Sequence, residues 1–101
     1  MVGDYLHGAR QGLWQHFSAD GRLRSEGPYE RGDLHGRWTW YRANGSLLQR
    51  GEFDQGVKHG RWERWDAEER PIDAGDYTRG RKTGEWTCYN PDGTIKAVKQ
   101  H

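Results

Sequence analysis

The residues with the clearest chemical potential in this sequence are two histidines that recur at a fixed interval. His35 and His59 lie 24 residues apart, each directly before a glycine. Stacked imidazoles can bind a metal ion, but a zinc site needs three or four converging ligands. The positions one interval before and after them hold Gln11 and Thr83, and no Cys, Asp or Glu recurs with them. We therefore expect turn residues here, with no metal and no cofactor.

Two other stretches resemble reactive sites without meeting their requirements. Cys88 is the only cysteine, and no recurring Cys–His–Asp arrangement supplies the base that a thiol nucleophile needs. The stretch GRKTGEW, residues 80–86, has three residues between its glycines and then Glu85, whereas a phosphate-binding loop has four and then lysine. No pair of carboxylates recurs at a position suited to acid–base catalysis. We therefore expect a protein that is not an enzyme.

Composition narrows the class of protein further. The 101 residues suffice for one domain, and a net charge of +1 argues against a nucleic-acid binder. No apolar run is long enough to span a membrane, and the N-terminus lacks the pattern of a secretion signal. A lone cysteine is typical of a reducing compartment, so we expect a cytoplasmic protein. Only 32% of the residues are hydrophobic, yet 13% are aromatic, which favours a thin fold held together by rings.

Those rings follow a strict 24-residue period. Four tryptophans define it, and each is followed three residues later by a ring and preceded nine residues earlier by another. The tryptophans are Trp14, Trp38, Trp62 and Trp86, the following rings are Phe17, Tyr41, Trp65 and Tyr89, and the preceding rings are Tyr5, Tyr29, Phe53 and Tyr77. Glycines keep the same frame, in the pattern G-x-[YF]-x-x-G-x-x-x-G-x-W. The chain therefore consists of four repeat units, residues 3–26, 27–50, 51–74 and 75–98.

Each unit contains the signals for two β-strands and two turns. Asp-Gly or Asn-Gly dipeptides at residues 20–21, 44–45 and 92–93 are strong hairpin signals, and aromatic and β-branched residues favour strands between the turns. No helical period extends over more than a turn. We therefore predict an all-β fold, in which an antiparallel β-meander of about eight strands forms a single domain over residues 1–101.

Two details of this meander stay open in the sequence. Trp38 and Tyr41 have an odd spacing, so either both faces of the sheet carry aromatic rings or a bulge realigns them. The third unit has Glu69 where the other units have the hairpin glycine, and Pro71 where they have Leu or Ile. Because proline cannot donate a ladder hydrogen bond, we expect a bulged or widened turn there.

The glycine and aromatic positions together resemble a known repeat family. GPYERGDLHGRWTWYRANGSL, residues 27–47, and GEFDQGVKHGRWERW, residues 51–65, resemble MORN repeats, and more closely the bacterial MORN-variant repeats. The resemblance covers nearly the whole chain. It implies a sheet built from repeated β-hairpins and a role as an interaction module. Members of the variant branch are commonly described as the antitoxins of toxin–antitoxin pairs.

One aromatic residue falls outside the repeat pattern and marks a candidate interface. Trp40 occupies a position that holds His16, Arg64 and Cys88 in the other units, so the repeat does not require a ring there. Tryptophan and arginine are enriched in binding hot spots, and an acidic turn steers basic partners. The residues that we predict to contact a protein partner are Trp40, Arg37, Arg61, Arg64, Trp65, Glu68 and Glu69. An additional core ring is the alternative for Trp40.

Three functions are compatible with these observations. The first is a non-catalytic protein-binding module, in its most specific form an antitoxin or immunity-type protein that occludes a toxin sterically. The second is a MORN-like scaffold on a membrane, with the basic residues Arg10, Lys58, Arg81 and Lys82 at acidic lipid. The third is a homo-oligomer formed through unpaired edge strands, which can accept a strand from another chain. We expect no nucleic acid as a partner.

Overall fold

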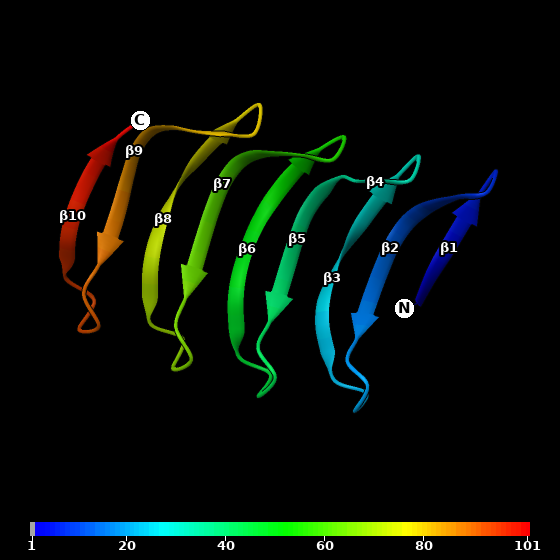
Figure 1. The fold of residues 1–101 in the computed structure, drawn as a ribbon, viewed down its shortest axis with the longest axis horizontal. Coiled ribbons are helices and arrows are strands. Elements are labelled where there is room, and N and C mark those ends of the chain that lie inside the picture. Colours follow the sequence, from blue (N-terminus) through cyan, green and yellow to red (C-terminus); the bar gives the residue numbers. More distant parts are fainter. Residues whose placement is uncertain (1) are drawn as a thin grey trace.

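Ten β-strands build the described part of the chain, residues 2–101, in a computed structural model (Figure 1). The strands are β1 (Val2–Leu6), β2 (Ala9–Phe17), β3 (Leu23–Glu30), β4 (Asp33–Leu34), β5 (Gly36–Tyr41), β6 (Leu47–Asp54), β7 (Val57–Trp65), β8 (Pro71–Thr78), β9 (Arg81–Tyr89) and β10 (Ile95–Gln100). They form one sheet in which every neighbouring pair is antiparallel. The predicted all-β antiparallel meander is therefore confirmed. The described residues include no helix that could cross a membrane.

The strands follow one another across the sheet in chain order, with β4 beside β3. β4 is separate from β5 because the chain leaves the ladder at His35, whose N–H bonds to the carbonyl of Pro28 at 3.1 Å. The two outer strands, β1 and β10, run in the same direction (Figure 1). A second copy that continues the antiparallel pairing with the same face on the same side must therefore use like edges, β1 against β1 or β10 against β10.

The sheet is a single layer with two different faces. Its extents are 46 × 33 × 13 Å, and the described residues place no second layer on either side. One face, here called the tryptophan face, carries the four repeat tryptophans and the rings nine residues before them. The other, the reverse face, carries the rings three residues after the tryptophans. Tyr41 illustrates this, because its hydroxyl bonds at 3.2 Å to Glu26, which pairs with Thr39, the neighbour of Trp38.

Both faces carry aromatic rings because the bulges lie on the returning strands. The partner of Tyr41 is Leu47 whereas the partner of Trp40 is Gln49, so Leu48 is the extra residue. The tryptophan strand keeps its alternation, and the odd spacing therefore places the tryptophan and the later ring on opposite faces. The same shift of register recurs in the other units.

A row of interlocking rings on the tryptophan face forms the core. All four repeat tryptophans are buried, and Trp38 is the most enclosed, at 1% exposure. Each tryptophan meets the ring nine residues before it edge to face, with ring centroids 5.1 to 5.3 Å apart. Contacts between units, such as Trp14 with Tyr29 at 5.8 Å, continue the row. Because such ring pairs contribute stability beyond their buried area, they hold each unit to the next.

Each repeat tryptophan lies over the glycine that opens its own unit. These glycines are Gly3, Gly27, Gly51 and Gly75, and a Cβ on any of them would overlap the indole ring. Beside the glycines the register shifts, or in unit two the strand breaks, and the indole Nε1–H bonds to the carbonyl of the next residue. The acceptors are the carbonyls of Asp4, Pro28, Glu52 and Asp76, at 2.8 to 3.2 Å. The glycine and the tryptophan therefore form one structural element.

The turn of the third unit, which the sequence predicted to be bulged or widened, is not widened, and the bulge beside it at Ile72 is the one that every unit has. Asp66 N–H donates to Arg70 O at 2.9 Å and Glu69 N–H to Asp66 O at 2.9 Å, the same two hydrogen bonds as in the other hairpin turns. Glu69 adopts the left-handed conformation that glycine has elsewhere, with a φ of 61°. This costs a non-glycine residue about 1 kcal/mol. Asp66 offsets the cost by accepting two backbone N–H groups of the same turn, and Pro71 begins β8 without disturbing it.

Candidate binding surface

A row of cationic side chains lies on top of the aromatic row. Arg10, Lys58 and Lys82 share one repeat position, four residues before the tryptophan, and the even spacing brings them to the tryptophan face. The same position in unit two holds Leu34. Arg10 Cζ lies 5.2 Å from the ring centroid of Trp14 and 5.3 Å from that of Tyr29. Lys58 Nζ lies 4.9 Å from the centroid of Trp62 and 5.0 Å from that of Tyr77. Lys82 Nζ lies 4.7 Å from the centroid of Trp86. These are cation–π contacts, which keep the charged groups over the rings.

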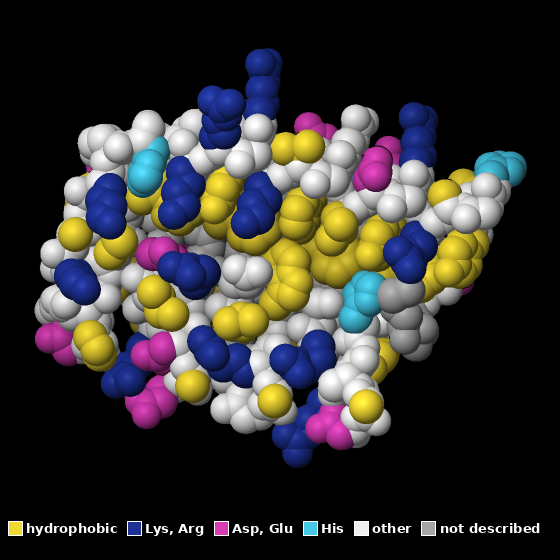
Figure 2. Space-filling model, viewed as in Figure 1, with side chains coloured by type: hydrophobic (Ala, Val, Ile, Leu, Met, Phe, Trp, Pro, Cys, Tyr) yellow, Lys and Arg dark blue, Asp and Glu magenta, His cyan; other side chains and the backbone are white. Residues whose placement is uncertain are grey.

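Figure 2 shows the result on this face of the molecule. Hydrophobic side chains form a band across the strands, and Lys and Arg side chains are spaced along it. Among residues 2–101, none of Arg10, Lys58 and Lys82 forms an ion pair with a carboxylate. Their charges are therefore available to an anionic ligand.

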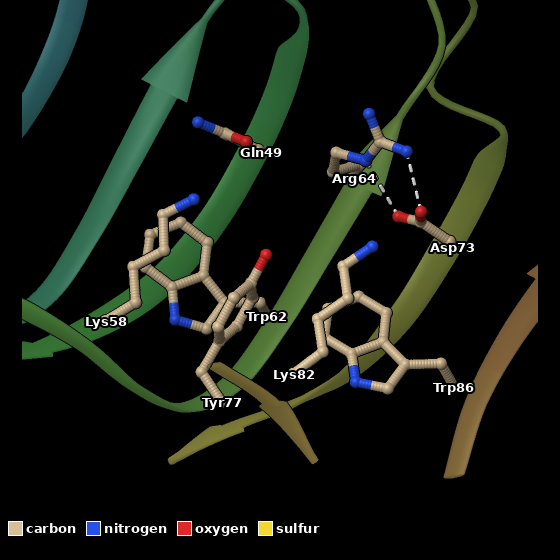
Figure 3. Close-up of a pocket in the computed structure, with 8 residues that line it drawn as sticks. All are labelled: Gln49, Lys58, Trp62, Arg64, Asp73, Tyr77, Lys82 and Trp86. Carbon is tan, nitrogen blue, oxygen red and sulfur yellow. Dashed lines mark hydrogen bonds and ion pairs between the residues drawn. The ribbon is translucent and has the colours of Figure 1, made fainter. Parts of the chain in front are cut away.

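A hollow of about 220 Å³ opens in the tryptophan face over units three and four (Figure 3). Its lining consists of Gln49, Lys58, Trp62, Arg64, Asp73, Tyr77, Lys82 and Trp86. The rings form its base, and the ammonium groups of Lys58 and Lys82 lie on separate rings (Figure 3). Opposite them, Arg64 and Asp73 face each other across β7 and β8. The hollow therefore combines an apolar base with a polar rim.

The only carboxylate in this hollow is already neutralised. Arg64 donates from Nε and Nη2 to the two oxygens of Asp73, at 2.8 and 2.6 Å. The bonded carboxylate raises the pKa of the Arg64 guanidinium above its ordinary value. The Asp73 side chain is only 9% exposed, whereas that of Arg64 is 52% exposed. The hollow therefore carries the net positive charge of Lys58 and Lys82.

A second hollow, of about 360 Å³, continues the surface toward the C-terminus. It shares Arg64, Asp73, Lys82 and Trp86 with the first and adds Ile72, Cys88, Tyr89, Lys96, Lys99 and His101. His101 contacts Trp86 edge to face at 6.2 Å, as Tyr29 contacts Trp14 in the first unit. The positively charged surface therefore extends to the last residues of the chain.

Comparison with protein-family models matches residues 10–31, 34–55 and 82–100 to the MORN repeat variant. These segments make up more than half of the chain. The chain belongs to the MORN repeat variant family. The stretch between them contains the irregular turn of the third unit, although its tryptophan contacts are those of the other units.

No curated protein sequence matches the chain significantly. A solved structure described as the crystal structure of a GtfA/B complex bound to UDP and GlcNAc is similar over 82% of this chain, with a TM-score of 0.45 and 15% sequence identity. The chain spans 21% of the length of that protein.

The seven residues predicted to contact a partner do not form one surface of the MORN sheet. Trp40 and Arg64 lie on the tryptophan face, two strands apart, with Gln49 between them. Arg37 and Arg61 flank the repeat tryptophans in sequence and therefore point to the reverse face. Trp65 lies there too, 5.3 Å from Arg50 Cζ, and Glu68 and Glu69 lie at a hairpin tip. A single partner on one face would contact only some of the seven.

Trp40 connects the second and third MORN units. Its ring lies 6.1 Å from Trp38, 5.5 Å from Trp62 and 6.0 Å from Phe53, and it is half-buried. These contacts continue the aromatic row between units. The geometry therefore gives Trp40 a packing role, which was the alternative interpretation in the sequence.

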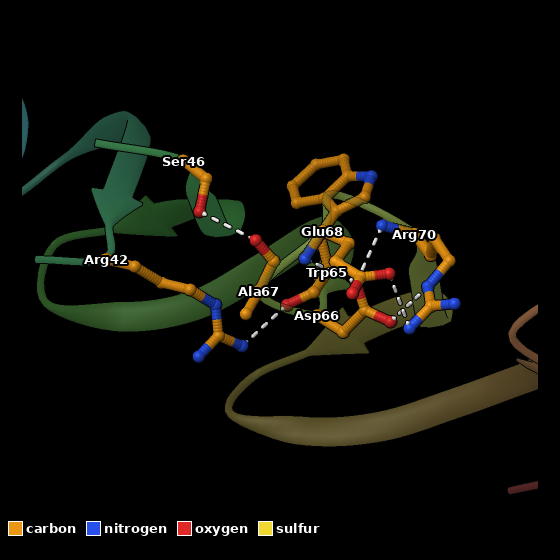
Figure 4. A network of polar contacts seen from close by, with 7 residues as sticks. All are labelled: Arg42, Ser46, Trp65, Asp66, Ala67, Glu68 and Arg70. Atoms are coloured by element: carbon orange, nitrogen blue, oxygen red, sulfur yellow. Dashed lines mark hydrogen bonds and ion pairs between the residues drawn. The ribbon is translucent and has the colours of Figure 1, made fainter. Parts of the chain in front are cut away.

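The acidic turn of the third unit uses its carboxylates within the fold (Figure 4). Glu68 forms an ion pair with Arg70 at 3.0 Å, and Glu69 accepts the backbone N–H of Leu47 in the neighbouring unit at 3.1 Å. A hydrogen bond from the Arg70 backbone N–H, with further bonds within the turn, lowers the pKa of Asp66 below its ordinary value. From unit two, Arg42 Nη2 donates to the carbonyl of Trp65 at 2.9 Å. These contacts join neighbouring hairpin tips.

The histidines and the glycine-rich stretch take structural positions. His35 lies 3.2 Å from a Glu30 oxygen and 4.0 Å from an Asp54 oxygen. Residues 2–101 hold no group of three or more His, Cys, Asp or Glu side chains arranged for a metal ion. The stretch 80–86 begins at a turn and enters β9, so its backbone belongs to the sheet.

Sequence reasoning did not recognise the cation row as part of the tryptophan face. It grouped Lys58 and Lys82 with Arg10 and Arg81 as basic residues for acidic lipid, without relating them to the repeat tryptophans. The signal that would have found the row is the constant offset of four residues from the repeat tryptophan. Lys99 and His101 were missed because they lie beyond the fourth unit.

Proposed function

We propose that this MORN repeat protein is a non-catalytic protein-binding module that binds its partner on the tryptophan face of units three and four. The observation that carries the proposal is the pair Lys58 and Lys82, which lie unpaired over buried rings beside a carboxylate already bonded to Arg64. A surface of this kind favours an acidic partner, because within the described part of the chain the two exposed cations have no carboxylate of their own to neutralise them. In the most specific form of the proposal, the partner is a toxin that the protein sequesters.

The shape of the sheet supports a macromolecular ligand. A single layer of 46 by 33 Å exceeds the about 800 Å² that one protein contributes to a typical interface. The rings are held edge to face and by indole hydrogen bonds, so little conformational entropy is lost when a partner binds. The two hollows are shallow features of this surface, which suits an extended contact.

The experiment is affinity capture from lysate of the source cells, with two charge-matched variants. Lys58→Gln/Lys82→Gln removes two cations from the tryptophan face, and Arg37→Gln/Arg61→Gln removes two from the reverse face. We expect one protein to co-purify at fixed stoichiometry with the parent chain and with the Arg37/Arg61 variant, and to be lost from the Lys58/Lys82 variant. Sedimentation of the purified complex checks the stoichiometry.

The same cations would also attract an anionic membrane, so a second experiment distinguishes a protein partner from a lipid partner. The parent chain is mixed at physiological salt with vesicles of neutral lipid and with vesicles containing anionic lipid. If the chain cosediments with the anionic vesicles but not with the neutral ones, and no protein is captured from the lysate, the protein-binding proposal is overturned in favour of the lipid scaffold. Retention of the same proteins by both variants would show that the binding face is misplaced.

A further inference from the structure

The cation row and Leu34, which takes its place in unit two, occupy evenly spaced positions across the sheet. Arg10, Leu34, Lys58 and Lys82 lie 24 residues apart, which corresponds to two strands per step. With about 4.8 Å between neighbouring strands, one step across the sheet is about 9.6 Å. Equivalent residues of successive units face each other through the strand between them, as Glu63, Ala74 and Thr87 do, so the repeat step runs across the strands.

An extended peptide has a matching period. A polyproline II helix rises about 3.1 Å per residue and completes one turn in three residues, so every third side chain points the same way after about 9.3 Å. Side chains at positions i and i+3 of such a peptide therefore match one MORN unit. A β-strand does not match, because its side chains at i and i+3 point to opposite sides and those at i and i+2 span only about 6.6 Å.

Recognition across the strands must come from side chains. The strands inside the sheet use both of their edges for pairing with neighbouring strands, so the face offers few free backbone groups. What it offers instead is the unpaired ammonium groups of Lys58 and Lys82, the guanidinium of Arg10 and, between them, the apolar Leu34. The chemistry of the row is therefore cation, cation, apolar, cation from unit four to unit one.

We infer that the partner segment is an extended peptide, laid across the strands of the tryptophan face, whose every third side chain faces the row and is acidic except opposite Leu34. Its side chains at i, i+3 and i+9 are Asp or Glu, opposite Lys82, Lys58 and Arg10. The side chain at i+6 is apolar and contacts Leu34, which packs against the same buried rings as Trp40. The inference rests on the proposed function and names the chemistry of the partner.

The test uses synthetic peptides of identical composition. One carries acid, acid, apolar and acid at positions i, i+3, i+6 and i+9, separated by proline and alanine, and is made in both chain directions. The other carries the same residues with the three acids consecutive. Binding is measured by fluorescence anisotropy at physiological salt. We expect the periodic peptide, in one direction, to bind about tenfold more tightly than the consecutive one.

Variants of the protein show whether the preference comes from the cation row. Lys58→Gln/Lys82→Gln is expected to abolish the preference for the periodic peptide, and Arg37→Gln/Arg61→Gln to leave it unchanged. Replacing the apolar residue of the peptide by glutamate is expected to weaken binding despite the added charge. Circular dichroism of both variants confirms that the sheet is folded.

Three results would overturn the inference. They are equal affinity for the two peptides, no binding of either, and a preference that persists in Lys58→Gln/Lys82→Gln. If the Lys58/Lys82 variant nevertheless loses a captured protein partner, the protein-binding function stands and only the periodic acidic peptide is wrong. If no partner protein is captured at all, the proposed function fails whatever the peptides do.

Discussion

The indole of Trp62 lies over the backbone of Gly51, so closely that a Cβ at this glycine would come within 3.0 Å of the ring. The indole Nε1–H donates to the carbonyl of Glu52, the next residue, at 3.2 Å. Gly51 is required for space alone, since its backbone is not in the left-handed region. This contact repeats in every unit and allows a single-layered sheet to bury four tryptophans.

Gly51→Ala is therefore expected to destabilise the protein by about 1–3 kcal/mol or more, because the added methyl group forces the indole out of its position. Urea denaturation followed by tryptophan fluorescence measures the loss. The control is Gly45→Asn in a hairpin turn, where φ is 89° and a Cβ meets no atom within 4 Å. Asparagine tolerates that conformation, so this change is expected to cost less than about 1 kcal/mol. Equal losses for the two variants would contradict the steric explanation.

Trp40→Ala is expected to lower the free energy of unfolding by about 2–4 kcal/mol, because the ring packs against Trp38 and Trp62. Trp40→His, the residue that unit one has at this position, is expected to cost less. Trp65→Ala on the reverse face serves as the matched control, since its ring contact is with Arg50. If Trp40→Ala unfolds at the same urea concentration as the parent, Trp40 has no packing role.

The ion pair of Arg64 and Asp73 is expected to respond unequally to removal of its two partners. Arg64→Ala leaves a carboxylate that is 9% exposed without its charge partner, and costs about 2 kcal/mol or more. Asp73→Asn keeps a hydrogen-bond acceptor and leaves Arg64, which is half-exposed, in contact with water, so it costs less than about 1 kcal/mol. Thermal unfolding of both variants measures the difference. If Asp73→Asn costs more than Arg64→Ala, the burial of Asp73 does not explain how the pair contributes to stability.

Acidification is expected to destabilise the fold through His16. Burial against Tyr29 and Trp38, and next the positive charge of Arg10, lower the pKa of His16 from its ordinary value of 6.5. The unfolded chain therefore takes up the proton at a higher pH than the folded chain does. The contribution of His16 to stability is complete above pH 6.5 and is lost as the pH falls through the lowered pKa.

His16→Gln tests this assignment. Urea midpoints of the parent chain and the variant are compared at pH 8 and pH 5, with the four other histidines unchanged. The variant is expected to lose less stability than the parent over this interval. An identical loss in both proteins would place the acid sensitivity at another group.

Much of the fold follows from the period of the sequence. Because the same pattern of glycines and rings recurs every 24 residues, each unit must form the same strands and turns, and antiparallel hairpins joined by short turns give a meander. The family resemblance has the same basis. The turn at Glu69 is not widened because its geometry depends on the hydrogen bonds that Asp66 accepts from two backbone N–H groups and not on glycine alone.

By itself, then, the sequence determined the strand order, the units and the residues that must be rings or glycines. Only the tertiary structure decided which residues share a face and meet across strands. It placed Lys58 and Lys82 over tryptophans, paired Arg64 with Asp73 and separated Trp65 from Trp40. The physical reason is register, because a bulge of one residue changes the cross-strand neighbours of every side chain beyond it, and local sequence does not specify that position.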